Sequence, residues 1–323
     1  MAPAILPAPP FHQVPVATFS IVAYDPETKD LGVAVESKFF AVGSVVPWAK
    51  AGVGAIATQA FGNTTYGPKG LELLASGKTP AEVIEALTSA DEGRDRRQVG
   101  IVDAEGNAAT YTGKGCNPWA GGKTGTHYSA QGNILVSEQV VAAMGEAFEK
   151  AKGELADRLL AALEAGQSAG GDSRGQQSAA LFVVRDSGGY AGFNDRYIDL
   201  RVDDNSEPIK ELGRLLKIQH AMSRLNEASA LYGQGKYKEA VEAARKAVEY
   251  RPDYGDAHYD LACFLSLAGD ADNSLKELEI ALRLSPKLGS LARTDSDLNN
   301  VRSDPRYEKI LSELAAERPA EKK

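Results

Sequence analysis

The residue types that most often carry nucleophilic or metal chemistry are scarce in this chain. Two Cys and four His occur among 323 residues, and neither Cys116 nor His127 belongs to a recognisable catalytic motif. The sequence has no H-E-x-x-H, G-x-S-x-G or P-loop pattern, and no G-x-G-x-x-G follows a predicted strand. We therefore interpret Cys116 and His127 as structural residues, and we expect neither a metal site nor a cofactor.

Thr18 offers a different chemistry because it is the first residue of the first predicted strand. The preceding residues 1–17 contain five Pro and no Asp, Glu, Lys or Arg, a composition that disfavours regular structure. Cleavage after Ala17 would give Thr18 a free α-amine with a pKa of about 7.7–8.0, which suits a general base. Thr18 would then supply both nucleophile and base. Without cleavage, it is an ordinary strand former.

Three origins of such a cleavage remain open: a truncated signal peptide, a misassigned start codon, or autoproteolysis. Ala17 suits the last position of a signal peptide. However, Pro15 does not suit the third position before the cleavage site, and the segment lacks the Lys or Arg with which a signal peptide begins. We slightly favour a cytoplasmic location. The alternative is a secreted or periplasmic protein, if residues 1–17 are a truncated signal.

A second predicted strand forms a hairpin with the Thr18 strand, so the residues at its end can lie near Thr18. Glu36 or Ser37 could hold the amine of Thr18, and Lys38 or Lys50 could lower the pKa of the amine and of the hydroxyl. The alternative interpretation of both lysines is a solvated surface charge.

Three amide side chains near strand ends are candidates for substrate binding. Gln59, Asn63 and Asn133 could donate hydrogen bonds to an oxyanion, although ordinary turn chemistry explains them equally well.

The densest polar cluster is the segment 170–178. In it, Asp172 and Arg174 could bind the amine and carboxylate groups of a substrate, with Gln176 beside them. Alternatively, Asp172 and Arg174 only pair with each other in a loop that precedes a strand.

Local patterns predict the elements that must position these residues. Thr79 is a good N-cap for the second of four predicted helices, and Pro80 is its first residue. Because hairpins dominate, we expect largely antiparallel sheets with helices outside, an α+β class rather than a doubly wound nucleotide fold. The predicted strands are 18–24, 31–35, 53–60, 98–103, 108–112, 128–131, 179–185 and 196–202; the helices are 66–75, 80–90, 137–151 and 155–165.

The composition changes near residue 220, where 27 of the 32 Gly have already occurred. Beyond it, Ala228, Gly235, Ala247 and Pro252 recur 34 residues later as Ala262, Gly269, Ala281 and Pro286, which is the tetratricopeptide period. Helices are expected at 221–233, 237–250, 255–267 and 271–284, followed by a terminal helical cap from 291 to 314. The repeats predict a protein or peptide partner, or else packing on the first domain or a homo-oligomer.

The charge and hydropathy of the chain exclude further classes. A net charge of −8 argues against nucleic-acid binding, which needs a basic surface. No apolar run approaches 18 residues, so we expect no membrane span. The division we predict is a leader at 1–17, a mixed domain at 18–205, a connecting helix at 206–220 and a repeat domain at 221–323.

Several motifs, in order, resemble the family catalogued as domain of unknown function 1028. They are TFSIVAYDPETKDLGVAVESKFFAVGSVVPWAKAGVGAIATQAF, GCNPWAGG, YSAQGNIL and GGDSRGQQSAALFVVR, and the resemblance covers residues 18–218. It implies the N-terminal-nucleophile hydrolase fold, a four-layer αββα sandwich. It also places Thr18 above the other candidates, and Lys50, 32 positions later, has a spacing similar to a lysine of the proteasome-like relatives.

The resulting hypothesis is an amide-bond hydrolase whose processed Thr18 attacks a small amide, an acylated amino acid or a short peptide. The alternative is a catalytically inactive hydrolase-like domain that serves as a platform, with the repeats as a protein-binding module.

Overall fold

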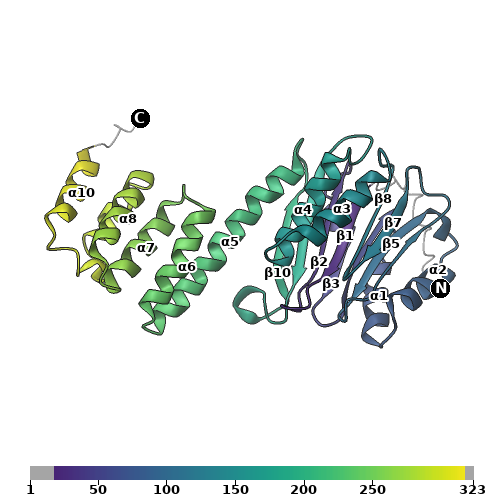
Figure 1. Cartoon of the computed structure of the whole chain (residues 1–323), viewed down its shortest axis with the longest axis horizontal. Helices are drawn as coiled ribbons and strands as arrows, with labels where there is room; N and C mark the ends of the chain where they lie inside the picture. The colour runs from purple at the N-terminus through teal and green to yellow at the C-terminus, as the bar shows by residue number, and fades with distance from the viewer. Residues whose placement is uncertain (1–17, 317–323) are drawn as a thin grey trace, which may run out of the picture. The chain divides into compact units, whose positions relative to one another are not determined.

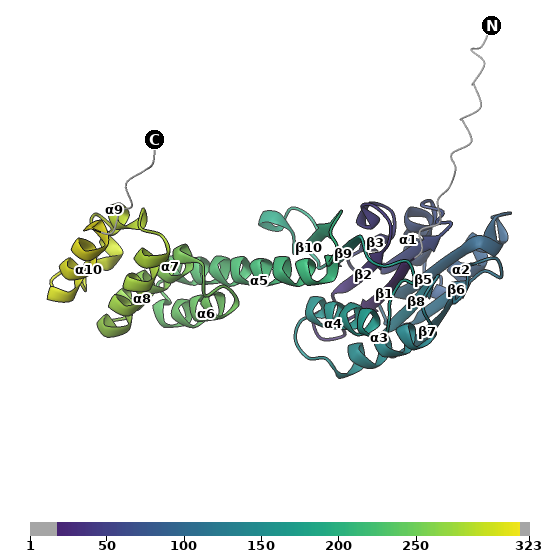
Figure 2. The ribbon, with the colours of Figure 1, turned by 90° about the horizontal axis from the view of Figure 1, so that it is seen from above.

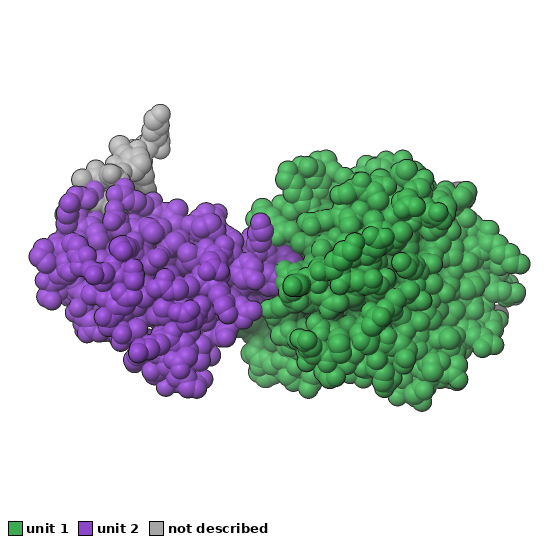
Figure 3. Space-filling view, viewed as in Figure 1, with its two compact units in different colours: residues 1–214 green, residues 215–323 purple. Residues whose placement is uncertain are grey.

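The computed structural model describes residues 18–316, and the expected leader at 1–17 lies outside the described residues. The chain forms two compact units, residues 1–214 and 215–323, which Figure 3 colours separately. None of the described helices is long and apolar enough to cross a membrane.

The first unit contains two antiparallel sheets, as the hairpin pattern predicted (Figure 1). The six-stranded sheet has the order β10-β9-β2-β1-β8-β7, and the four-stranded sheet has the order β3-β4-β5-β6. In the first sheet the strands are β1 (Thr18–Tyr24), β2 (Leu31–Ser37), β7 (Gly121–Gly125), β8 (Tyr128–Asn133), β9 (Ser178–Val184) and β10 (Arg196–Val202). In the second they are β3 (Pro47–Lys50), β4 (Gly54–Ala60), β5 (Arg97–Asp103) and β6 (Ala108–Thr112).

Two of these strands were not predicted from the sequence. β7 has the sequence Gly-Gly-Lys-Thr-Gly and β3 is only four residues long, so neither has the β-branched content that marks a strand. Both form because a neighbouring strand supplies hydrogen-bond partners: β7 pairs with β8, and β3 pairs with β4.

Helices cover one face of each sheet in the first unit, and part of the space between the other two faces is an apolar core that includes Val22, Val33 and Val102. α1 (Tyr66–Ala75) and α2 (Pro80–Ser89) pack on the four-stranded sheet through a cluster that includes Ile56 and Val83. α3 (Gln139–Lys150) and α4 (Leu155–Ser168) lie against the six-stranded sheet (Figure 2). Thr79 is the N-cap of α2, as predicted, and it forms a capping box with Glu82.

The second unit contains the predicted helical repeats. The helices are α5 (Pro208–Gly233), whose first seven residues belong to the first unit, then α6 (Tyr237–Tyr250), α7 (Gly255–Leu267) and α8 (Ala271–Leu284), followed by α9 (Leu288–Ala292) and α10 (Pro305–Ala316). Ala228, Ala247, Ala262 and Ala281 are all fully buried, because a small side chain is needed where two helices approach closely. The expected connecting helix and first repeat helix are one continuous helix, α5, since no Gly or Pro separates them.

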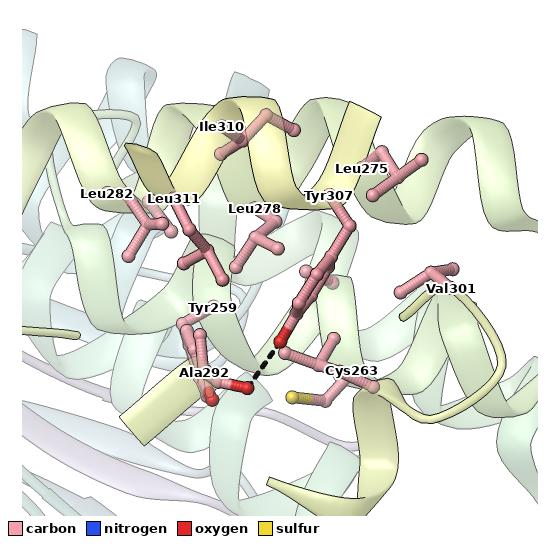
Figure 4. Close-up of a cluster of buried hydrophobic side chains, with 13 residues drawn as sticks. Tyr259, Cys263, Leu275, Leu278, Leu282, Ala292, Val301, Tyr307, Ile310 and Leu311 are labelled. Carbon is pink, nitrogen blue, oxygen red and sulfur yellow. Dashed lines mark hydrogen bonds between the residues drawn. The ribbon is translucent and has the colours of Figure 1, made fainter. Parts of the chain in front are cut away.

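The terminal cap has the spacing of a third repeat. α10 begins 34 residues after α8, since 305 − 271 = 34, and the short α9 occupies the place of a first repeat helix. In Figure 4 the side chains of Leu275 and Leu278 from α8 meet Tyr307 and Leu311 from α10. Tyr307 donates a hydrogen bond to the carbonyl of Ala292, which fixes α9 to α10. The cap therefore covers the apolar face that the last repeat would otherwise expose.

Candidate functional site

Thr18 begins β1 in the middle of the six-stranded sheet. The strand register places it opposite Ser37 at the end of β2 and opposite Asn133 at the end of β8. Its hydroxyl is fully buried and donates a hydrogen bond to the Ser37 hydroxyl at 3.0 Å. The first residue of β1 and the last residues of β2 and β8 are thus polar and lie side by side. They share one face of the sheet, the face that is turned toward the four-stranded sheet.

Two glutamines from the four-stranded sheet reach this position. The Gln59 amide, on β4, donates to the Thr18 carbonyl at 3.3 Å and to Gln98 Oε1 at 2.8 Å. Gln98, on β5, also accepts a bond at 3.0 Å from the Asn133 amide, and it donates to the Gly132 carbonyl at 2.7 Å. These bonds connect the two sheets at the end where Thr18 lies.

The same network continues between the two sheets, two residues further along β1, at Ser20. Ser20 donates to Gln59 Oε1 at 2.6 Å and accepts at 2.7 Å from the amide of Gln131, which in turn accepts from Ser129 at 2.8 Å. Gly100 lies against this amide, because a Cβ there would be 2.0 Å from Gln131 Oε1. We call the whole set the inter-sheet polar network: Thr18, Ser20, Ser37, Gln59, Gln98, Ser129, Gln131 and Asn133, each at most 1 % exposed.

The loop 170–178 closes over the end of β2. Asp172 accepts a hydrogen bond from the Lys38 amide at 3.1 Å and forms a two-point ion pair with Arg174, at 2.8 and 3.1 Å. The Lys38 ammonium donates to the Gln176 carbonyl at 3.1 Å. Four residues that were proposed from the sequence are therefore brought together: Lys38, Asp172, Arg174 and Gln176. Lys38 lies 134 residues before Asp172 and 138 residues before Gln176 in the chain.

Glu36 lies in this region but on the other face of the sheet. Side chains alternate along a strand, so Glu36 shares a face with its cross-strand neighbour Phe19, not with Thr18 and Ser37. The Phe19 ring lies near Gly166 of α4, which identifies this as the helix-covered face. Of the two residues offered as partners of Thr18, Ser37 contacts it directly, whereas Glu36 lies on the opposite face of the sheet.

Lys50 and Asn63 are not part of this site. Lys50 pairs with Gly54 at the start of β4, whereas Gln59 lies five residues further along, about 17 Å at the usual rise of a strand. Sequence spacing placed Lys50 near Thr18, but the direction of β3 carries it to the opposite end of the sheet. Asn63 donates to Asp91 at 3.1 Å and lies in a groove of about 810 Å³ between α1 and α2.

The interpretation of Cys116 as a structural residue agrees with its surroundings. Its thiol donates to the Arg97 carbonyl at 3.4 Å, and burial raises its pKa, which disfavours the reactive thiolate. The carbonyl of His127 accepts a hydrogen bond from the Tyr24 amide, so this residue helps to join β1 to the turn before β8.

The site offers a hydroxyl and several amide donors, but no charged base within the inter-sheet polar network. All eight members carry neutral side chains, and Lys38 is bound to the loop carbonyl of Gln176. In the sequence as given, the Thr18 nitrogen belongs to the peptide bond with Ala17. Only a cleavage at this bond would create an amine beside the hydroxyl, and with it the base for nucleophilic chemistry.

Sequence reasoning missed four members of this network: Ser20, Gln98, Ser129 and Gln131. A signal was present, because Ser129 and Gln131 are polar residues at alternate positions of the predicted strand 128–131, and Asn133 continues this alternation in β8. Such a pattern indicates a polar face inside the protein. The identity of its partners on β4 and β5 depends on how the two sheets stack, which the local pattern does not contain.

Comparisons with known proteins support the two-part organisation of the chain. Residues 18–212 match the model of a family of unknown function (DUF1028), and residues 231–291 match a tetratricopeptide repeat model. The crystal structure of a Silicibacter pomeroyi protein, described as DUF1028, is 34 % identical with a TM-score of 0.57. The match covers 62 % of this chain and 88 % of that one. No curated protein matches the chain.

Proposed function

The chain belongs to the DUF1028 family, whose function is unknown, and we propose that its first unit is an amide-bond hydrolase with Thr18 as the nucleophile. Two antiparallel sheets that face each other, with helices on the outer faces, agree with a four-layer N-terminal-nucleophile hydrolase fold. In that fold the nucleophile is the first residue of a central strand, and Thr18 has this position in β1.

The observation that carries the proposal is the contact between the Thr18 and Ser37 hydroxyls, 3.0 Å apart at the ends of two paired strands. After cleavage at the Ala17–Thr18 bond, the Thr18 Oγ would attack the carbonyl carbon of an amide and its own amine would accept the hydroxyl proton. The amine would then return this proton to the leaving nitrogen, and water would release the acyl group. Ser37 and the amides of Gln59 and Asn133 would stabilise the oxyanion.

The loop 170–178 would form one wall of the substrate site. It contacts the residue after Ser37 through the bond from the Lys38 amide to Asp172. The side chain of Arg174 is 32 % exposed, and guanidinium groups bind carboxylates well, so Arg174 and Gln176 would meet a carboxylate-bearing substrate. A small amide, an acylated amino acid or a short peptide has this chemistry.

The mass of the native N-terminus tests the proposal most directly. The full chain is isolated from its own cell, its intact mass is measured, and its activity is assayed on a panel of N-acyl amino acids and short peptide amides. We expect a chain that starts at Thr18, activity that is lost in Thr18→Ala, and partial activity in Thr18→Ser, which keeps a hydroxyl. A chain that keeps residues 1–17, and shows no difference between wild type and Thr18→Ala, would refute the hydrolase.

The second unit suggests protein partners, because tetratricopeptide repeats commonly serve as interaction surfaces. A second candidate function follows, in which the first unit is an inactive platform and the repeats bind a partner. The peptide bond at Thr18 and the neutral inter-sheet polar network favour it, since an uncleaved Thr18 has no base. An uncleaved native chain would therefore favour this alternative over the hydrolase.

A further inference from the structure

Glu36 is a buried acid without a hydrogen-bond partner. Its side chain is fully buried, and neither carboxyl oxygen has a partner among the described residues. Its cross-strand neighbours on this face of the sheet are Phe19 on β1 and Ala179 on β9, and both are apolar. An ionised carboxylate in such a place loses its hydration and gains no bond in return.

The neighbouring acid, Asp172, has the opposite environment. Its carboxylate accepts four hydrogen bonds: one from the Lys38 amide at 3.1 Å and three from Arg174, at 2.9 Å from its backbone and at 3.1 and 2.8 Å from its guanidinium. Its side chain is also fully buried. Of the two buried acids, Asp172 therefore holds the Arg174 guanidinium, whereas Glu36 forms no hydrogen bond to it.

The charged groups that act on Glu36 are few. They include Asp172 and Arg174 from the loop and Lys38 from the end of β2. Burial raises the pKa of Glu36 well above its usual value, and the negative charge of Asp172 raises it further, while Arg174 and Lys38 lower it less. The nearby Gln177 amide also favours the charged form, although this N–H donates to the Ser37 carbonyl at 3.1 Å.

We propose that Glu36 is a positioning residue that acts as an uncharged acid: while protonated, it leaves Arg174 and the Lys38 amide to Asp172 and so keeps the loop 170–178 docked on β2. Loss of its proton would add a second buried negative charge near Asp172, and this charge would attract Arg174 away from Asp172. The bond from the Lys38 amide to Asp172 and the bond from the Gln177 amide to Ser37 would then weaken together.

The loop touches the proposed nucleophile site through Ser37. Glu36 precedes Ser37 in β2, and Ser37 receives both the Gln177 amide, at its carbonyl, and the Thr18 hydroxyl, at its side chain. Undocking of the loop would therefore loosen the partner of the Thr18 hydroxyl. This effect on catalysis rests on the proposed function, whereas the docking of the loop does not.

Two measurements on the full chain test the proposal without any activity assay. In the first, glutamate carboxyl carbons are labelled with ¹³C and followed by NMR against pH, and the Glu36 signal is identified by its absence in Glu36→Gln. We expect its titration midpoint well above the usual value for glutamate, and the exposed Glu27 on the same hairpin provides the control substitution. A midpoint at the usual value for glutamate would overturn the proposal.

The second measurement is hydrogen exchange of the Lys38 and Gln177 amides, corrected for the intrinsic dependence of exchange on pH. Because the docked loop holds one more proton than the open one, protection should fall by up to tenfold per pH unit from about pH 5 to the Glu36 midpoint, then level off. Glu36→Gln should abolish this dependence, and Glu27→Gln should leave it unchanged. Equal pH dependence in wild type and Glu36→Gln would refute the positioning role, even if Thr18 proved to be catalytic.

Discussion

Replacement of Gly100 by Ala perturbs the inter-sheet polar network at a single point. A Cβ at residue 100 would be 2.0 Å from Gln131 Oε1 and 2.4 Å from its Cδ, so the amide would have to leave its place. Gln131 would then lose its bonds with the Ser20 and Ser129 hydroxyls, at 2.7 and 2.8 Å. All three side chains are fully buried, so the freed groups cannot turn to water.

The expected loss of stability follows from these bonds. A buried polar group left without a partner costs about 1–3 kcal/mol, and two such groups would cost about 2–6 kcal/mol. Ala also restricts the unfolded chain more than Gly does, which offsets about 0.4–1 kcal/mol. We therefore expect Gly100→Ala to lower the free energy of unfolding of the first unit by about 1–6 kcal/mol.

Urea unfolding followed by tryptophan fluorescence measures this change in the full chain. Both tryptophans, Trp48 and Trp119, belong to the first unit, so the signal reports that unit. The control is Gly213→Ala in α5, where the new Cβ would meet only Leu160 at 3.4 Å, an ordinary contact. In a helix, Ala is favoured over Gly by up to about 1 kcal/mol, so the control should not lose stability.

A double mutant separates this mechanism from a general packing defect. If the clash acts through the Gln131 amide, Gly100→Ala combined with Gln131→Ala should cost less than the sum of the two single changes. Wild-type stability of Gly100→Ala, or strict additivity in the double mutant, would show that the amide is not held against Gly100 as described.

Two further predictions concern acid stability and the repeats. Burial raises the pKa of Asp91, but hydrogen bonds from Arg97, Asn63, the Gly93 amide and Tyr66 lower it more, so the carboxylate should stabilise the first unit above about pH 4 and lose this effect as the pH falls further. In urea unfolding against pH, Asp91→Asn should cost about 1–3 kcal/mol at pH 7 and progressively less below pH 4, whereas a constant difference would contradict this assignment. Ala262→Leu should destabilise the second unit by about 1–3 kcal/mol, because Ala262 is fully buried between helices. Thermal melting followed by circular dichroism of the helices should show a lower melting temperature for this variant, but not for the control Lys238→Leu at an exposed position.

The sequence was sufficient for those features that depend on neighbours along the chain. The 34-residue offset of Ala228 and Ala262 predicted the repeats, because each repeat is built from local helix pairs and buries its small residues in the same way. The capping box of Thr79 and the hairpin of β1 and β2 are likewise short-range structures. The predicted hairpin put Glu36 and Ser37 near Thr18 but did not choose between them.

Only the tertiary structure decided the chemistry around Thr18, because that chemistry depends on contacts between distant segments. Gln59 and Gln98 reach the site by the stacking of two sheets, and Asp172 reaches Lys38 across 134 residues. Because of the direction of β3, Lys50 lies at the far end of the sheet from Thr18. The Glu36 side of β2 is buried because α4 packs on it. Strand pairing and local pattern fix which residues share a face, but only the packing of helices and sheets on that face fixes their partners and their charge.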